Sequence, residues 1–548
     1  MAATGDSSAG PSAGKIGAPR PGVFVRNATG LVREAGAWDV FIFNSNNQNL
    51  GIGALFILLF LGFYNGGNLE LATILTMLCT IPMAVVYALF AAAMPRSGGD
   101  YVYNSRTLGP IWGFVSSFNW LFWMLVYVGV PAAFVSSFGI APWFRMMGAM
   151  TGNTTLVAWG NGISGLWGTI IAGTLLLLLF AAIFVKGVHL YFRIQNWGFM
   201  IAMVGIVLMV IGVLVGAAHF QANLNSYIVG FGGSHNGVKV IEAAAAKSGF
   251  RYSPFNFGNT ILLMTWVIFI IPFSITSSQI GGEVKSASRA QLIGMPGSVI
   301  FVAVGLLVLM GVVHMVVGGA LLSAISLAPP ASYGAVFPLY VQELVGAASG
   351  SVVLAGLIGL CFIFFTYVWL PINFLASTRV LLAWSFDRLM PEKVAEVHPR
   401  THTPIVAIAI VLVLGEVSLV LYALGVLSLL SGIFGWLLSF LLTSVAAVVF
   451  PYRRRDLFEA SPVNWRLGGV PVLTIMGVLA VIGLLIMEAI LWVDPLVGMV
   501  ANNPTSHLMD IITPAVIIGG AVIYLVAKYV QGKRGIQIEH AFAEIPPE

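Results

Sequence analysis

Apolar runs long enough to cross a lipid bilayer constrain this chain more than any other feature of its sequence. A helix needs about 20 residues to span ~30 Å of hydrocarbon, and windows of about 19 residues place such runs at twelve positions. Runs such as Gly168–Phe184 do not alternate polar and apolar residues, as the strands of a membrane β-barrel do. The chain is therefore predicted to be an all-α membrane protein of about 12 transmembrane helices. The expected spans are 38–63, 69–94, 112–137, 165–186, 190–216, 258–282, 296–322, 350–384, 404–424, 426–450, 470–493 and 509–531.

Charged residues are too few for a water-facing domain. They make up 8% of the 548 residues, against roughly 25% in soluble proteins. No cytoplasmic connection between spans is long enough for a catalytic domain, so the chain is predicted not to be an enzyme. Cys79 and Cys361 lie inside expected spans without a CxxC pattern, which gives no support for a metal or a cofactor. The cationic residues form no basic stripe, so a nucleic-acid partner is not expected.

The placement of Lys and Arg predicts the orientation. With the N-terminus inside, 21 of these residues fall in cytoplasmic segments, and only Arg145, Lys239, Lys247 and Arg251 fall outside. Positive residues accumulate on the cytoplasmic side of membrane proteins. We therefore expect a multi-pass protein of the cell membrane with both termini in the cytoplasm.

The spans divide the chain into segments. Residues 1–35 are rich in Gly, Ser, Ala and Pro and are predicted to be a disordered cytoplasmic tail. Residues 217–257 form the expected extracellular loop, and 532–548 a second cytoplasmic tail. The outer loops carry helical patterns at Val238–Lys247 and Val336–Val345, which serve either as lids over a site or as packing between span ends.

The first span contains a polar interruption. Asn44–Asn49 are six consecutive polar side chains, followed by Leu50, Gly51, Ile52 and Gly53. Polar groups at this depth either line a pathway or pack against neighbouring helices. Asparagine is a good helix N-cap, so Asn49 is predicted to cap a new helix that begins at Leu50.

The sixth span contains a second interruption. Pro272 removes a helix hydrogen bond and disfavours helical geometry at Ile271, and the Ser/Thr run that follows is expected to cap a restarted helix. Spans one and six open two sets of five spans, 36–216 and 258–450, and 451–531 adds a cytoplasmic loop and two peripheral helices. Paired broken helices in corresponding positions indicate a transporter site between two repeats.

Four sequence segments resemble the amino acid–polyamine–organocation (APC) superfamily. Met94–Tyr103 is similar to that family's "P-R-S-G-G-x-Y-x-Y" stretch after the second span, and Gly51–Leu55 to the "G-x-G-I" break in the first. Glu283–Lys285 resembles the end of the sixth span, and Ser377–Leu381, with Asp387–Pro391, resembles the eighth-span signature. The resemblance implies a leucine-transporter-like fold of two inverted five-helix repeats plus two peripheral helices.

The resemblance also implies a substrate site. A substrate carboxylate would meet backbone amides after the first break, and an amine would meet carbonyls around the second. Ser274 stands where the family often has glycine. Carried onto this sequence, the candidate substrate-binding residues are Asn49, Leu50, Gly51, Ile52, Gly53, Ile270, Ile271, Phe273 and Ser274.

Two further sets of residues are candidates for supporting roles. Arg96, Arg106, Glu283 and Arg379 fall at cytoplasmic span ends, and we hypothesise that Glu283 pairs with one of these arginines as a gate. Glu416 is the deepest ionisable residue in the spans. It is either a proton relay or a hydrogen-bonded structural acid.

The sequence therefore predicts a secondary active transporter that moves amino acids across the cytoplasmic membrane by alternating access. Two alternatives remain open, a transporter of the same fold for polyamines or other organic cations, and an amino acid sensor that does not transport. The substrate, the coupling ion (H⁺ or Na⁺) and the oligomeric state stay open as well.

Overall fold

Among the described residues, twelve helical segments are long and apolar enough to cross a membrane, and they make up most of the structure. The computed structural model describes residues 31, 33–427, 431–498, 504–538 and 542. Most of the predicted tail at 1–35, and the last part of 532–548, lie outside the described residues. The predicted all-α membrane architecture with twelve spans is confirmed.

The first five spans are built from seven α-helices. They are α1 and α2 (Ala37–Gln48, Leu50–Phe60, then the 3₁₀ turn η1, Leu61–Tyr64), α3 (Leu69–Ala93), α5 and α6 (Pro110–Phe134, Ala141–Thr151, joined by the π-turn η2, Val135–Ile140), α8 (Leu166–Lys186) and α9 (Val188–Gly216).

The other spans follow these five along the chain. They are α12 (Phe257–Ile268) with the 3₁₀ turns η4 (Ile271–Phe273), η5 (Thr276–Gln279) and η6 (Gly281–Glu283), α13 (Ala287–Val317), α16 and α17 (Val352–Tyr367, Trp369–Phe386), α18 (Ile405–Ala423), α19 (Ser431–Arg453), α21 (Val472–Val493) and α22 (Pro504–Lys533).

Short elements connect the spans. The helices are α4 (Gly99–Thr107), α7 (Thr154–Ile163), η3 (Ala217–His219), α10 (Phe220–Val229), α11 (Gly237–Lys247), α14 (Gly319–Leu327), η7 (Pro330–Tyr333), α15 (Val341–Ser349), η8 (Glu392–Val394) and α20 (Arg455–Glu459). Strands β1 (Arg466–Leu467) and β2 (Val470–Pro471) form an antiparallel hairpin.

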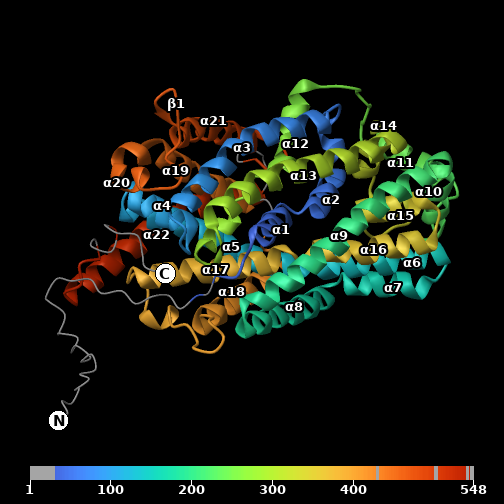
Figure 1. Ribbon diagram of the computed structural model, residues 1–548. Helices are drawn as coiled ribbons and strands as arrows, with labels where there is room; N and C mark the ends of the chain where they lie inside the picture. The colour runs from blue at the N-terminus through green and yellow to red at the C-terminus, as the bar shows by residue number, and fades with distance from the viewer. Residues whose placement is uncertain (1–30, 32, 428–430, 499–503, 539–541, 543–548) are drawn as a thin grey trace, which may run out of the picture.

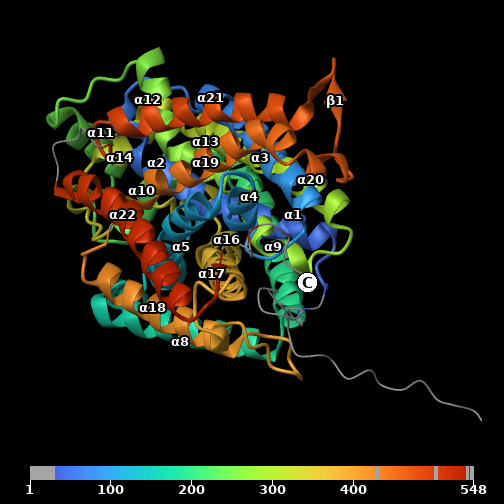
Figure 2. The ribbon, with the colours of Figure 1, turned by 90° about the vertical axis from the view of Figure 1, so that its left-hand side faces the viewer.

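The helices pack as two related sets of five. α1 packs along α13 while α12 packs along α3, and α5 packs along α19 while α16 packs along α9. The contact between spans one and seven thus has its counterpart in the contact between spans six and two. The contact between spans three and ten likewise matches that between spans eight and five, as the inverted repeat predicts. Figure 2 shows α8 and α18 together at one face of the bundle, with the almost fully buried α17 in its interior.

The connections gather at two opposite ends of the bundle. α4 and α20 lie at one end, which we call the α4 end, and α6, α7, α10, α11 and α15 lie at the other, which we call the α11 end (Figure 1). Leucine, isoleucine and valine side chains remain exposed on the outer helices between these ends, for example Leu175 on α8 and Val207 on α9. These belts of exposed apolar side chains suit contact with lipid.

Several span ends differ from the predicted ones. The third span runs on to Thr151 because the π-turn η2 carries the helix forward without a break. The fifth span continues through α10, whose buried Phe220 and Leu224 give it an apolar face. The predicted loop 217–257 is therefore partly helical, and it contains the predicted helix at Val238–Lys247 as α11. The helix predicted at Val336–Val345 begins only at Val341.

Candidate functional site

The first span breaks at Asn49, as predicted. Asn49 adopts the left-handed conformation, with φ 54° and ψ 74°, which asparagine tolerates better than most residues. Its Oδ1 accepts a hydrogen bond from the Ile52 amide at 3.2 Å, and its Nδ2 donates to the Phe365 carbonyl at 2.8 Å. The predicted cap on a new helix from Leu50 is confirmed, and the cap also ties the break to the eighth span.

The backbone amides of Leu50 and Gly51 are the first two of α2. The Gly53 amide donates to the Asn49 carbonyl at 2.9 Å, and the Ile52 amide to the Asn49 side chain. Within α2 itself the amides of Leu50 and Gly51 have no acceptor, because the first residues of a helix have no preceding carbonyls in that helix. Free amides at a helix N-terminus carry partial positive charge and bind anions. The buried start of α2 is thus able to bind a carboxylate.

The sixth span breaks around Pro272, but it does not restart as an α-helix. α12 ends at Ile268, whose carbonyl lacks its usual donor because Pro272 has no N–H. Three 3₁₀ turns follow, so the expected restarted helix is wrong. Ser277 shows the reason, because its amide donates to Asn44 Oδ1 at 3.0 Å and its carbonyl accepts from Gln291 Nε2 at 3.0 Å. Side chains of α1 and α13 therefore satisfy backbone groups that a restarted helix would have paired internally.

The asparagine run of α1 joins the two breaks. Asn47 Nδ2 donates to the Phe273 carbonyl at 3.1 Å, and Asn44 Nδ2 donates to Ser277 Oγ at 2.9 Å. Trp369 of the eighth span donates from Nε1 to the Asn47 carbonyl at 2.6 Å. In this conformation the run packs against neighbouring segments, which is the second of the two interpretations given above.

Apolar side chains fill the space between the breaks. A Cβ added to Gly51 would lie 2.4 Å from Phe365 Cγ, and one added to Gly53 would lie 2.4 Å from Ile270 Cδ1. Phe273 packs edge-on against Trp436 with ring centroids 4.7 Å apart. The predicted site residues of spans one and six are therefore brought together, and the aromatic residues of the eighth and tenth spans complete their surroundings.

Two other predicted site residues in the sixth span are also buried at this point. Ile271 lies in η4, directly before Pro272, and Ser274 follows that turn. Ser274 Oγ has no hydrogen-bond partner among the described residues. The serine is thus a spare polar group beside the apolar walls of Phe273 and Ile270.

A buried ion pair joins the sixth and eighth spans at the α4 end. Arg379 donates from Nε and Nη2 to the two carboxylate oxygens of Glu283, at 2.5 and 2.9 Å. Both side chains are almost fully buried. Of the three arginines considered as partners of Glu283, the structure selects Arg379.

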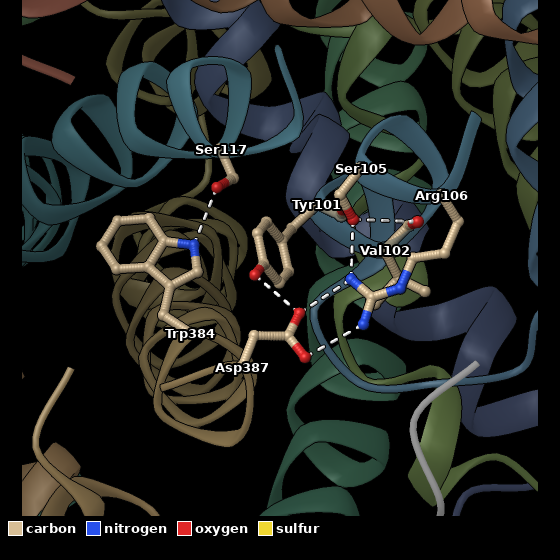
Figure 3. Close-up of polar contacts among 7 residues, drawn as sticks. All are labelled: Tyr101, Val102, Ser105, Arg106, Ser117, Trp384 and Asp387. Atoms are coloured by element: carbon tan, nitrogen blue, oxygen red, sulfur yellow. Dashed lines mark hydrogen bonds and ion pairs between the residues drawn. The ribbon is translucent and has the colours of Figure 1, made fainter. Parts of the chain in front are cut away.

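Arg106 pairs instead with Asp387, an acid that the sequence analysis did not include among the gate residues. Arg106 Nη1 lies 2.8 Å from Asp387 Oδ2, and the Tyr101 hydroxyl donates to the same oxygen at 2.7 Å (Figure 3). All three side chains are buried. Asp387 stands directly after the eighth span in a segment that resembles the family signature. This position in the sequence could have identified it as a partner of the gate arginines.

Backbone pairing completes the closure of the α4 end. The amide of Ala35 donates to the Glu283 carbonyl at 3.0 Å, and the Gly98 amide donates to the Gln279 carbonyl at 2.9 Å. Arg96 bonds the neighbouring Pro95 carbonyl with its side chain, while its backbone lies against Gly281. The segments before α1 and before α4 thus cover the end of the sixth span.

At the α11 end, a buried acid connects both broken spans. Asp494 Oδ2 accepts hydrogen bonds from the Tyr64 hydroxyl at 2.7 Å and from Thr265 Oγ1 at 2.9 Å. Tyr64 ends the first span, Thr265 belongs to α12, and Asp494 follows the peripheral helix α21. No motif pointed to this contact, because Asp494 stands more than two hundred residues from either partner.

Glu416 belongs to α18 and contacts α8. Its Oε1 accepts a hydrogen bond from Thr174 Oγ1 at 2.6 Å. Neither residue belongs to the two breaks, so this contact fits the interpretation of Glu416 as a hydrogen-bonded structural acid.

Asp100 is a buried acid beside the end of the sixth span, outside the membrane-spanning segments. Its Oδ1 accepts from Gln279 Nε2 at 2.8 Å and from the Tyr101 amide at 3.0 Å, and Oδ2 has no partner among the described residues. Burial raises the pKa of this carboxyl from 3.8 to about 6. Since the ionised form is disfavoured in the folded protein, stability falls as the pH rises from 3.8 to about 6 and stays lower above it.

We expect Asp100→Asn to stabilise the protein at pH 7.5 and to have little effect near pH 4. The asparagine keeps the oxygen that Gln279 contacts and removes a charge worth on the order of 3 kcal/mol, at about 1.36 kcal/mol per pKa unit. Thermal unfolding of the purified protein across this pH range measures the difference. The exposed Asp456 provides the control, because Asp456→Asn should leave the profile nearly unchanged. An Asp100→Asn profile parallel to that of the wild type would contradict the prediction.

Comparison with known proteins gives two matches. The sequence pattern of a protein family described as "Amino acid permease" matches residues 36–521. The branched-chain amino acid permease BcaP of Bacillus subtilis (strain 168) is 25% identical over 463 residues, which cover 82% of this chain and 86% of that protein. The family match extends over the two broken spans.

Proposed function

This chain belongs to the amino acid permease family of membrane transporters, and we propose that it carries amino acids by alternating access to a site between the two broken spans. Membership confirms the resemblance to the APC superfamily and identifies a transporter rather than an enzyme. The proposal adds the mechanism, secondary active transport, and the place of the site.

The amides of Leu50 and Gly51 are the observation that carries this proposal. They are buried, they begin a helix, and they have no acceptor within that helix. The carbonyl of Ile268, freed by Pro272, lies in the facing break and suits an ammonium group. Neither break contains a charged side chain. A zwitterion would therefore be bound by main-chain groups, and its release would leave no fixed charge buried.

The walls of the site favour apolar amino acids. Phe365 and Ile270 lie against the start of α2, and Phe273 lies in the facing break beside Trp436. The relative BcaP is named for branched-chain amino acids, and valine, leucine and isoleucine have side chains that fit such walls. We propose these amino acids as the first substrates to test.

Uptake by proteoliposomes tests the proposal. Purified protein is reconstituted and supplied with labelled L-valine or with isobutylamine, the same molecule without its carboxylate, under a proton or a sodium gradient. Uptake of valine above that of protein-free liposomes, with little uptake of the amine, is the expected result. Preference for the amine would support the organic-cation alternative, and valine binding without uptake would support the sensor; either result would overturn the proposal.

We also propose that the α4 end faces the cytoplasm, as the distribution of Lys and Arg predicts. In a background without Cys79 and Cys361, His235→Cys at the α11 end should react with a membrane-impermeant maleimide in intact cells. Leu467→Cys in the exposed β1 hairpin should react only after permeabilisation. The reverse pattern would show the opposite orientation.

A further inference from the structure

A cavity lies at the α11 end, away from the two breaks. It has a volume of about 130 Å³ and lies between α6, α7 and the segment 334–339. Roughly 10–15 Å³ is enough for one water molecule, so this cavity has room for a ligand of several heavy atoms. Its lining combines apolar residues such as Val157 and Pro338 with three polar side chains, Arg145, Asn161 and Glu343.

Arg145 brings an unused hydrogen-bond donor to this cavity. The residue is 3% exposed. Its Nη1 donates to Ser164 Oγ at 3.1 Å, its Nε lies 3.4 Å from Glu343 Oε1, and its Nη2 has no partner among the described residues. The contact with Glu343 is longer than the two contacts of 2.5 and 2.9 Å between Arg379 and Glu283. Arg145 is thus incompletely paired, and a buried charged donor without a partner is costly.

The same cavity also has acceptors without donors. Asn161 Oδ1 is buried and has no partner among the described residues. The Oε1 of Glu343 makes a long contact of 3.4 Å with Arg145 Nε, while its Oε2 accepts from the Tyr340 amide at 3.2 Å. The lining of the cavity therefore combines one strong donor with two acceptors.

Aromatic contacts place this cavity on the approach to the central site. The ring of Tyr340 lies 5.6 Å from the Arg145 guanidinium carbon and packs edge-on against Phe138, with ring centroids 5.3 Å apart. Phe138 in turn packs against Phe56 of α2 at 5.5 Å. Tyr340 and Phe138 thus connect Arg145 at the cavity to Phe56 of α2, the helix that begins at the first break.

We propose that this cavity binds a zwitterionic amino acid, with its carboxylate on Arg145 and its ammonium group on Asn161 and Glu343. Arg145 and Glu343 already balance each other's charge, so a ligand without net charge keeps the site neutral, whereas a simple anion or cation would leave a buried charge uncompensated. The cavity is a second site for the transported molecule at the α11 end. This inference rests on the proposed function for the identity of the ligand, but not for the site itself.

Binding of labelled L-valine to the purified protein tests this inference in the Gly51→Val background, which is designed to remove the central site. We expect one site to remain there. Arg145→Lys keeps a charge opposite Glu343 but loses the second donor, and it should weaken the remaining binding at least tenfold. Asn161→Leu leaves the ion pair intact and should weaken it at least threefold. Isobutylamine and 3-methylbutanoate should compete poorly, since each carries only one of the two charged groups of valine.

The outcomes separate this inference from the proposed function. Lys247→Gln, an exposed charge at the same end, is the control and should leave valine binding unchanged. If Gly51→Val retains full binding, the central site is wrong, yet Arg145→Lys should still reduce the number of bound valines per protein. If Arg145→Lys does not fold, the effect of Asn161→Leu on valine binding decides whether the cavity is the remaining site. Absence of valine binding in Gly51→Val, or binding that neither cavity variant changes, would overturn the inference.

Discussion

Gly51→Val and Gly53→Val are expected to lower the affinity for amino acids at the central site at least a hundredfold. The valine side chain would stand between the substrate carboxylate and the amides of Leu50 and Gly51, and hydrogen bonds to a charged group contribute about 1.5–3 kcal/mol each. A Cβ at either position would also lie 2.4 Å from a side-chain carbon, of Phe365 or of Ile270. Labelled valine binding and proteoliposome uptake measure the two effects.

The control for these variants is a glycine in another span with open space around it. A Cβ added to Gly311 of α13 would have no atom within 4 Å, so Gly311→Val should bind and transport valine as the wild type does. Phe273→Ala should differ from both, because removing an apolar wall should change which side chains are accepted and leave the need for a carboxylate. Uptake by Gly51→Val at the wild-type rate would place the substrate elsewhere.

Breaking the pair of Glu283 and Arg379 is expected to be the most destabilising single change at the α4 end. Arg379→Gln leaves a buried carboxylate without its two charged donors, and losing one partner of a buried ion pair costs about 3–5 kcal/mol. Thermal or denaturant unfolding of the purified protein measures this loss. The double variant Glu283→Gln/Arg379→Gln should recover part of it, because two neutral amides can bond each other.

An exposed ion pair supplies the matched control. Arg388 and Glu392 are paired on the surface of the same end, and Arg388→Gln should cost less than about 1 kcal/mol. As a gate, the buried pair also has a conformational role, so a cysteine at the buried Ser97 should be labelled faster in Glu283→Gln. If Glu283→Gln changes neither transport nor this labelling, the pair is structural and not a gate.

The features that the sequence predicted best are those set by local chemistry. Twelve spans follow from the length of the apolar runs, and the break at Asn49 follows from the capping preference of asparagine. Pro272 marked the second break because proline removes a helix hydrogen bond. Each of these features depends on residues that are near one another in the chain, so composition and spacing were sufficient.

The features that the sequence did not predict depend on contacts between distant segments. The sixth span does not restart as an α-helix because Asn44 of α1 and Gln291 of α13 bond the residues around Ser277. Asp387 and Asp494 find their partners across the bundle. Phe365 packs against Gly51 only because α16 lies beside α2. No local pattern encodes such pairings.

A structure determined with bound L-valine tests the central claim most directly. The account predicts the carboxylate of valine within hydrogen-bond distance of the Leu50 and Gly51 amides, its ammonium group near the carbonyls that precede Pro272, and Phe365 displaced from its place against Gly51. A structure in which valine is bound only away from this break, with no contact to the Leu50 and Gly51 amides, would contradict it.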